Sequence, residues 1–275
     1  MDRDAPTSGV GFPTHRSKGR PLPKVSLRSL PMRVAFALIA AMSLVPVGAR
    51  GESRASDGVV AESVETTFRA DTWPDAVVDE IGGKVFGLAL SATRCATNAG
   101  DVGRPATLTV IDYSKPSTEP RLWVVDLAAR RLLFEELVAH GQGSGGNLAT
   151  RFSNLDDSHQ SSLGLFVTED AYVGKNGYSL RLSGLEPGIN DRAHERAIVI
   201  HGAPYVNDQI SRSLGRLGRS HGCPAVREFV ARPLIDRVKA GGVVFVYYPD
   251  RDWLTTSKYL DRCAAQPHAA HAATD

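Results

Sequence analysis

The chain has 275 residues, of which 42% are hydrophobic and 23% charged, so it has enough apolar side chains for one sizeable core and too many for a disordered protein. Its 32 Lys and Arg residues nearly balance its 30 Asp and Glu residues, giving a formal net charge of +2, and the sequence shows no overall basic field of the kind that grips nucleic acid. The three cysteines, Cys95, Cys223 and Cys263, are too sparse for a zinc ribbon, and their odd number leaves at least one thiol unpaired within the chain.

The first predicted element is a signal peptide at residues 1–49. Residues 34–45 are an apolar run of about twelve residues, too short to span a bilayer as a helix and of the right length for the core of a signal that is cleaved after Ala49. Met32 fits the true start, because a signal that begins there has ordinary proportions; the alternative is an uncleaved membrane anchor. No other run has the length of a membrane span, so we expect an exported protein, in the periplasm or cell envelope, with no membrane span in its mature form.

The export signal also carries most of the positive charge. Residues 1–49 hold seven of the basic residues and two of the acidic ones, so the mature chain has 25 basic against 28 acidic residues and a net charge of −3. Residues 50–74 are polar and small and predict a linker. Apolar side chains at helical spacing then predict a helix over 75–96. Residues 251–275 lose periodicity and predict an irregular, mostly disordered tail, which leaves one folded domain at 75–250.

After residue 103 the pattern changes to short runs of β-branched and aromatic residues, separated by loops rich in Gly, Asn and Ser. These runs predict strands at 107–113, 121–127, 131–140, 163–168, 178–184, 196–202 and 243–248, the first three forming a meander. One late helix is predicted over 225–238, with a kink or a second start at Pro233. The expected fold class is therefore mainly β with a few helices.

The residues that carry chemistry gather between 198 and 226. A polar loop that leaves a strand end is where protein scaffolds tend to place catalytic groups. Cys223 is the natural nucleophile, and because a thiol is only slightly ionised at neutral pH, it needs a base or a helix N-terminus beside it. Pro224 fits the first position of the helix predicted at 225–238, which would place Cys223 at or beside the N-cap.

Two histidines are candidate bases. His201 ends a predicted strand and can approach the sulfur from across the fold, whereas His221, two residues before Cys223, would line the same pocket; we expect His201 to be the base. The backbone N–H groups of Gly222 and Cys223 are the expected donors to an oxyanion. Ser220 would orient His221 or the loop.

Other polar residues of the segment are candidates for substrate binding. Arg216 and Arg219 could contact a substrate carboxylate, or could simply be solvated charges. Gly202 and Tyr205 are further candidate substrate-binding residues. This chemistry needs no metal and no other cofactor.

The remaining histidines and cysteines have less informative surroundings. We expect His140, His159 and His194 to be structural or on the surface. Cys95 and Cys263 could form a disulfide in an oxidising compartment.

With these residues in place, the sequence resembles the murein L,D-transpeptidase catalytic-domain family. Its hallmark is a strand that ends in His-Gly, then a loop, then Ser-His-Gly-Cys; here these are His201-Gly202 and Ser220-His221-Gly222-Cys223. The resemblance extends over residues 105–250 and includes residues 161–166, similar to the Thr-Pro-x-Gly-x-Phe strand entry of the family. Pro224-Ala225 differ from the hydrophobic residue and Arg or Asn that commonly follow the cysteine, and mark a divergent branch in which Arg219 or Arg216 would replace that residue.

The resemblance implies a β-sandwich-like catalytic domain, within 75–250, that uses cysteine to cut and rejoin peptidoglycan stem peptides. Cys223 would attack the carbonyl of the third, diamino-acid residue of a tetrapeptide stem, release D-alanine and form an acyl-thioester. An amine of a neighbouring stem would then form a cross-link, or water would trim the stem, as in an L,D-carboxypeptidase. The partners implied are peptidoglycan stem peptides and no nucleic acid. The catalytic roles are carried over to His201, Ser220, His221, Gly222 and Cys223.

Other classes remain open from the residues alone. In a zinc hydrolase, His201, His221 and Cys223 would be metal ligands, although the common zinc spacings are absent. A non-catalytic envelope-binding module would keep the fold with a decayed site. A papain-like peptidase fits less well, because its nucleophile precedes its histidine in the chain, whereas His201 precedes Cys223. The sequence does not indicate an oligomeric state.

Overall fold

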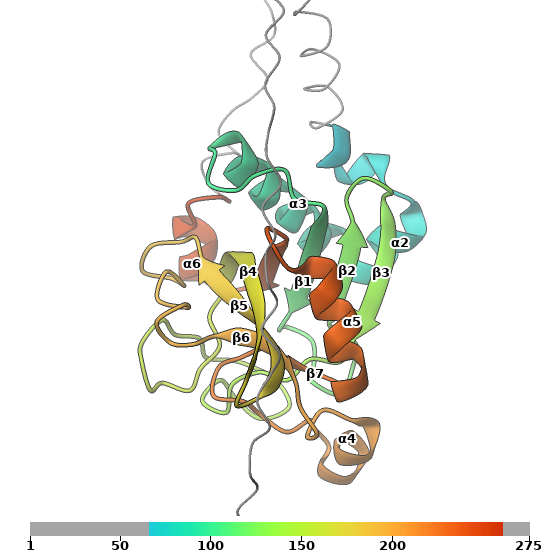
Figure 1. Cartoon of the computed structure of the whole chain (residues 1–275). Coiled ribbons are helices and arrows are strands. Elements are labelled where there is room, and N and C mark those ends of the chain that lie inside the picture. The colour runs from blue at the N-terminus through green and yellow to red at the C-terminus, as the bar shows by residue number, and fades with distance from the viewer. Residues whose placement is uncertain (1–65, 261–275) are drawn as a thin grey trace, which may run out of the picture. The chain divides into compact units, whose positions relative to one another are not determined.

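The structure, a computed structural model, describes residues 66–260; the predicted signal peptide, most of the predicted linker and Cys263 lie outside the described residues. In chain order the strands are β1 (Thr107–Asp112), β2 (Leu122–Asp126), β3 (Arg131–Glu136), β4 (Gly164–Gly174), β5 (Gly177–Gly184), β6 (Val199–Gly202), β7 (Ala225–Val226) and β8 (Val243–Tyr247). They form one 8-stranded sheet in the order β3-β2-β1-β8-β4-β5-β6-β7 (Figure 1). The expected mainly β class, with a few helices, is confirmed.

The helices of this range are the 3-10 turn η1 (Ala70–Thr72) and the α-helices α2 (Asp75–Ile81), α3 (Gly83–Asn98), α4 (Asp208–Leu214), α5 (Glu228–Val238) and α6 (Arg251–Thr256). The helix predicted over 75–96 is present, but divided into α2 and α3. Gly82 between them has a φ of +93°, a conformation that glycine adopts without the strain a side chain would add. No helix in the described range is long and apolar enough to cross a membrane.

The middle of the sheet is formed by a strand from the far end of the chain. β1, β2 and β3 form the predicted antiparallel meander. β8 then pairs in parallel with β1 and antiparallel with β4, so that Phe245 lies opposite both Val110 and Leu165. Every residue of β8 is buried, as expected of a strand that is covered on both faces. β8 thus joins the two halves of the sheet.

Strands β6 and β7 position the candidate catalytic residues. His201 and Gly202 end β6, as predicted. β7 pairs in parallel with β6, with His201 opposite Ala225. Ala225 also exchanges backbone hydrogen bonds with Ala139, at N–O distances of 2.8 and 3.4 Å. Because the two strands are parallel and Cys223 lies two residues before Ala225, this pairing holds the cysteine next to the start of β6, beside Ala197 and Val199.

The predicted helix start at residue 225 is wrong. Residues 225 and 226 form β7, and α5 begins at Glu228 with Arg227 as its N-cap. Backbone pairing on both sides of Ala225 overrides the helical periodicity of its side chains. Cys223 is therefore not at a helix N-cap, and the helix dipole, which acts within the first turn, does not explain how its thiol ionises.

The ends of the described range are more ordered than the sequence predicts. Within the predicted linker, Phe68 and Trp73 are buried, and Trp73 packs edge-on against Phe86 with ring centroids 4.9 Å apart. In the predicted tail, α6 buries Trp253, and Tyr259 is also buried. Single aromatic anchors have no periodicity, so pattern analysis does not reveal them. The linker and tail predictions are therefore wrong for residues 66–74 and 251–260.

Helix α4 lies in the segment 198–226, for which the sequence predicts only a loop between its strand and Cys223. Asn207 is the N-cap, and its Oδ1 accepts a hydrogen bond from the Ile210 amide at 2.8 Å. This capping stabilises the first turn of a helix too short to show a clear apolar face.

Candidate active site

A pocket of about 600 Å³ opens beside the end of β6. Seven of the nine predicted site residues line it: His201, Gly202, Tyr205, Arg219, Ser220, His221 and Cys223. Ala203, Pro204, Glu228 and the β4–β5 turn residues Lys175, Asn176 and Gly177 complete the lining. The pocket thus combines residues 201–205 and 219–223 of the predicted segment with residues of the β4–β5 hairpin and the first residue of α5.

Cys223 is a buried cysteine with a free thiol, whereas Cys95 is disulfide-bonded. The Cys223 Sγ lies 3.6 Å from the Ala197 carbonyl oxygen, to which the thiol donates. Burial raises the pKa of the thiol, while the Val199 amide and the charge of Arg196 act in the opposite direction. Burial therefore disfavours ionisation of Cys223, while backbone amides, among them that of Val199 at the start of β6, and the charge of Arg196 favour it.

His201 has the protonation state that a general base needs. Its Nδ1 lies 2.9 Å from the Gly202 carbonyl oxygen, and since that oxygen can only accept, Nδ1 carries the hydrogen and Nε2 of the neutral ring is an acceptor. Burial lowers the pKa of His201, which keeps the ring neutral near pH 7. In the described structure His201 and Cys223 form no hydrogen bond with each other, because the thiol donates to the Ala197 carbonyl oxygen instead.

His221 is exposed and stacks on a histidine from another loop. The rings of His221 and His159 lie with centroids 4.2 Å apart and an interplanar angle of 8°. Gln142 Nε2 donates to Nδ1 of His159 at 2.8 Å, which holds the ring beneath His221. His159, expected to be structural or on the surface, therefore supports the wall of the pocket on which His221 lies.

Ser220 shapes the turn that carries the cysteine. Its Oγ donates to the Cys223 carbonyl oxygen at 2.6 Å and accepts from the Gly222 amide at 3.1 Å. The Gly222 amide, expected as an oxyanion donor, is thus already used within the turn. Ser161, which the sequence analysis did not single out for a role here, donates from its Oγ to the Gly222 carbonyl oxygen at 3.1 Å.

Gly222 cannot be replaced at this position without movement of its neighbours. Its φ is +121°, and a Cβ built there would lie 2.8 Å from the Gln160 carbonyl oxygen and 3.0 Å from Ile198 Cδ1. Contacts this short are repulsive, and positive φ adds backbone strain for any side chain. Gly222 therefore acts through the shape of the turn.

The charged groups at the pocket are of both signs. Arg219 is partly buried, and its Nη1 donates to the Gly145 carbonyl oxygen at 2.8 Å. Arg216 does not line the pocket, and its Nη1 donates to the adjacent Leu217 carbonyl oxygen. Lys175 and Glu228 line the pocket, are exposed, and form no ion pair with another described residue. Lys175 precedes the segment 198–226 by more than twenty residues, and Glu228 follows its end. The spacing of the motifs therefore does not predict that either residue lines the pocket.

A buried pair of one arginine and one neutral histidine adjoins the loop that pairs with the Cys223 turn. Arg121 is fully buried and donates to the Val138 carbonyl oxygen at 2.7 Å and to Nδ1 of His140 at 2.8 Å. Burial and the Arg121 charge lower the pKa of His140 to about 4. The His140 carbonyl oxygen accepts from the Ser220 amide at 3.1 Å. His140 is thus a structural histidine whose backbone binds Ser220 of the cysteine turn.

The ligand set of the alternative zinc site is not assembled. Among residues 66–260 no three His, Cys, Asp or Glu side chains form a group that could hold a metal ion. His201, His221 and Cys223 line one pocket without forming such a group.

Comparison with known proteins identifies the family. A family model described as the L,D-transpeptidase catalytic domain matches residues 78–247, which is more than half of the chain. The chain belongs to this family, and the resemblance noted from its motifs is confirmed. No curated protein sequence is significantly similar to it.

Solved structures are similar at low sequence identity. They include an L,D-transpeptidase from Mycobacterium smegmatis, 15% identical over 52% of this chain and 59% of that chain with a TM-score of 0.33. L,D-transpeptidase 3 from Mycobacterium tuberculosis is 15% identical over 52% and 62%, with a TM-score of 0.32. The helical cell shape determining protein Pgp2 from Campylobacter jejuni is 11% identical over 55% and 54%, with a TM-score of 0.35. This chain spans less than two thirds of each.

Proposed function

We propose that this protein is a cysteine-dependent L,D-transpeptidase that acts on peptidoglycan stem peptides. The observation that carries the proposal is that a free thiol, Cys223, and a neutral imidazole, His201, line one open pocket. A thiol beside a base that can take its proton is the arrangement that acyl transfer requires. Membership of the family supports the same reaction.

The first step forms an acyl-thioester. Cys223 turns from the Ala197 carbonyl oxygen toward the pocket, and Nε2 of His201 takes the thiol proton; catalytic hydrogen bonds often form only once substrate is bound. The thiolate attacks the carbonyl of the third residue of a tetrapeptide stem. The C–S bond forms, the C–N bond to D-alanine breaks, and His201 returns the proton to the departing amine.

The oxyanion of that step has one backbone donor available. The Cys223 amide is not used by a hydrogen bond to any other described residue, whereas the Gly222 amide is bonded to Ser220. An amide held in a rigid turn and aimed at the developing charge stabilises the transition state without reorganisation. We assign the donor role to Cys223.

The second step releases the acyl group. Neutral His201 takes a proton from the amine of a neighbouring stem, the amine attacks the thioester carbonyl, and the C–S bond breaks to return the thiol. The product is a cross-link. If water replaces the amine, the product is a trimmed tripeptide, and the enzyme is an L,D-carboxypeptidase.

The charges of the pocket suit such a substrate. A stem peptide carries several carboxylates and, on its diamino acid, an amine. Lys175 and Arg219 are suited to bind the carboxylates and Glu228 to bind the amine, because charge-assisted hydrogen bonds are the stronger ones. The proposed substrate lies outside the cytoplasmic membrane, which agrees with the export signal predicted at residues 1–49.

Product analysis tests this function. The purified chain is incubated with disaccharide tetrapeptides, and the products are separated and weighed by mass spectrometry. We expect cross-linked dimers and free D-alanine, loss of both with Cys223→Ala or His201→Asn, and unchanged products with His194→Asn, since His194 is exposed and outside the pocket. Tripeptides without dimers would make the protein a carboxypeptidase instead, and full activity of Cys223→Ala would refute the proposal.

A further inference from the structure

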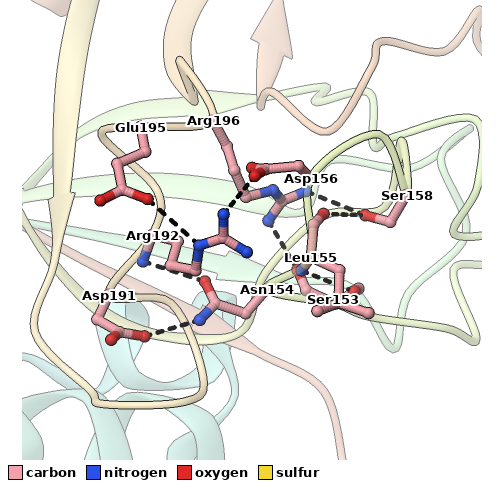
Figure 2. A network of polar contacts seen from close by, with 9 residues as sticks. All are labelled: Ser153, Asn154, Leu155, Asp156, Ser158, Asp191, Arg192, Glu195 and Arg196. Carbon is pink, nitrogen blue, oxygen red and sulfur yellow. Dashed lines mark hydrogen bonds and ion pairs between the residues drawn. The ribbon is translucent and has the colours of Figure 1, made fainter.

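Arg196 connects the segment before β6 to a loop that lies more than thirty residues earlier. Its Nη1 donates to the Ser153 carbonyl oxygen at 2.7 Å and to Ser162 Oγ at 2.6 Å, and its Nη2 donates to the Gln160 carbonyl oxygen at 2.7 Å and to Ser158 Oγ at 3.3 Å. Figure 2 shows the guanidinium directed into the 153–158 turn. A planar group with five donors suits several acceptors fixed in space, which a lysine cannot match.

Arg192 forms a second link between the same two segments. It donates to Asp156 and to Glu195, the latter at 3.3 Å, and its amide donates to Asn154 Oδ1 at 3.2 Å (Figure 2). Unlike Arg196, its side chain bonds only to exposed carboxylates. The two arginines therefore offer a matched pair, one turned inward and one at the surface.

The acceptors of Arg196 form the wall against which the cysteine turn packs. The Gln160 carbonyl oxygen, bonded to Arg196, is the group that a Cβ on Gly222 would meet first, at 2.8 Å, and Arg196 Nη2 is itself 3.5 Å from that position. On the other side, the carbonyl oxygen of Ala197, the residue after Arg196, accepts from the Cys223 thiol. Arg196 thus holds Gln160, against which Gly222 packs, and directly precedes Ala197, to which the Cys223 thiol is hydrogen-bonded.

We propose that Arg196 is a positioning residue for Cys223: it fixes the backbone around the cysteine and supplies the positive charge that stabilises the thiolate. The proposal rests on the proposed function, in which Cys223 is the nucleophile. Burial raises the pKa of the Cys223 thiol and the Arg196 charge lowers it. The arginine therefore offsets part of the effect of burial on the thiolate, which no helix dipole stabilises here because Cys223 is not at the N-cap of α5.

Several other titratable groups on the surrounding elements line the same pocket as the thiol or interact with it electrostatically. They are His201 on β6, Tyr205 after it, Tyr113 after β1, Lys175 on the β4–β5 turn, Glu228 on α5, and Arg219 and His221 on the cysteine's own loop. Burial raises the pKa of Tyr113 and of Tyr205 to about 12, so both phenols are neutral at pH 7. Lys175 and Glu228 are exposed, and solvent weakens their effect on the thiol.

The test is the pH profile of alkylation of Cys223 by iodoacetamide in the full chain, with the labelled peptide identified by mass. It needs no substrate, so it can succeed or fail independently of turnover. For Arg196→Gln we expect the midpoint to move upward by about one pH unit, the size of shift that loss of a close opposite charge produces. Arg192→Gln, the matched control, should keep the wild-type midpoint.

Thermal unfolding of each variant shows that the comparison is made between folded proteins. Equal midpoints for Arg196→Gln and Arg192→Gln would overturn the proposal. If Arg196→Gln does not fold, Arg196→Lys and Arg192→Lys replace the pair. Lysine keeps the charge but not the four hydrogen bonds, so Arg196→Lys should lower the rate of Cys223 acylation by tetrapeptide while Arg192→Lys does not. Equal acylation rates would overturn the proposal.

Discussion

At the scale of single residues, the reactivity of Cys223 depends on what surrounds its turn. Its thiol lies against the backbone of residues 197–199. Burial opposes ionisation of the thiol, and the charge of Arg196 favours it. Residue types alone single out Cys223 and His201 as candidates, because a Cys between Gly and Pro, with a His-Gly at the end of an earlier strand, is rarely needed for packing. Arg196 and Ser161 could not be found in this way, because Arg196 acts through hydrogen bonds to residues 34 to 43 positions away and Ser161 through a hydrogen bond to Gly222, 61 positions away.

Replacement of Gly222 by alanine tests the shape of this turn. The new Cβ would meet the Gln160 carbonyl oxygen at 2.8 Å in a residue with a φ of +121°, so the free energy of unfolding should fall by about 2 kcal/mol or more. Acylation of Cys223 should fall with it. Urea unfolding and a tetrapeptide turnover assay measure the two effects.

Gly87 in α3 is the matched control, because a Cβ there meets nothing within 4 Å. Gly87→Ala should leave turnover unchanged and stabilise the protein by about 1 kcal/mol, the helix propensity gained. A Gly222→Ala variant as stable and active as Gly87→Ala would show that the turn does not need glycine.

At the scale of elements, one ion pair joins the end of β3 to the start of α5. Arg227, the N-cap of α5, binds Glu136 through two hydrogen bonds, Nε to Oε2 at 2.7 Å and Nη2 to Oε1 at 2.8 Å. The Glu136 side chain is only 6% exposed. Because α5 packs on β6, this pair holds the helix that covers the strand carrying His201.

Arg227→Ala should lower the free energy of unfolding by about 3 kcal/mol, because it leaves a buried carboxylate without its partner. The control is Lys239→Ala at the other end of α5, whose pair with Asp236 has both side chains more than 40% exposed and should cost less than about 0.5 kcal/mol. Urea denaturation midpoints separate the two cases. Similar small losses in both variants would mean that the Glu136 pair does not hold α5.

Most elements could be predicted from the sequence, and the errors have physical causes. Seven of the eight strands were predictable because apolar runs between turn residues mark them, and β8 stands out as five consecutive apolar or aromatic residues; β7 was predicted as the start of a helix. The start of α5 could not be predicted, because the backbone pairing of Ala225 with Ala139 and with β6 depends on segments far apart in the chain. α6 is a single short turn that is capped by Asp250 and buries only Trp253, so it has no apolar periodicity that would reveal it.

At the scale of the whole molecule, the stability of the fold depends on one buried histidine, His140, that stays neutral. His140, which bonds to Arg121, is 1% exposed. Burial and the arginine lower its pKa from 6.5 to about 4. Burial and the Arg121 charge outweigh the contacts with the Gly145 and Gly146 backbone that favour the protonated ring, so protonation opposes the native state.

This predicts a loss of stability in acid. Between pH 6.5 and 4 the unfolded chain binds a proton at His140 and the folded chain does not, so the free energy of unfolding falls as the pH is lowered through this window. The loss from this group is about 3 kcal/mol and does not grow below pH 4. Urea unfolding at several pH values measures it.

A variant without this histidine isolates the effect. His140→Asn should be less stable at pH 7, yet it should lose less stability than wild type on going to pH 4. His194→Asn, a change at an exposed histidine, should follow the wild-type curve. Parallel curves for wild type and His140→Asn would show that His140 does not set the acid sensitivity.

The proposed reaction depends most on Cys223 being the residue that takes the acyl group from the stem peptide. The direct measurement is intact-protein mass spectrometry of the full chain mixed with disaccharide tetrapeptide and quenched in acid, followed by peptide mapping. We predict an adduct with the mass of the disaccharide tripeptide acyl group on Cys223, its loss on treatment with hydroxylamine, and its absence in Cys223→Ala. Turnover of the tetrapeptide by Cys223→Ala at the wild-type rate, or an adduct on another residue, would contradict the account.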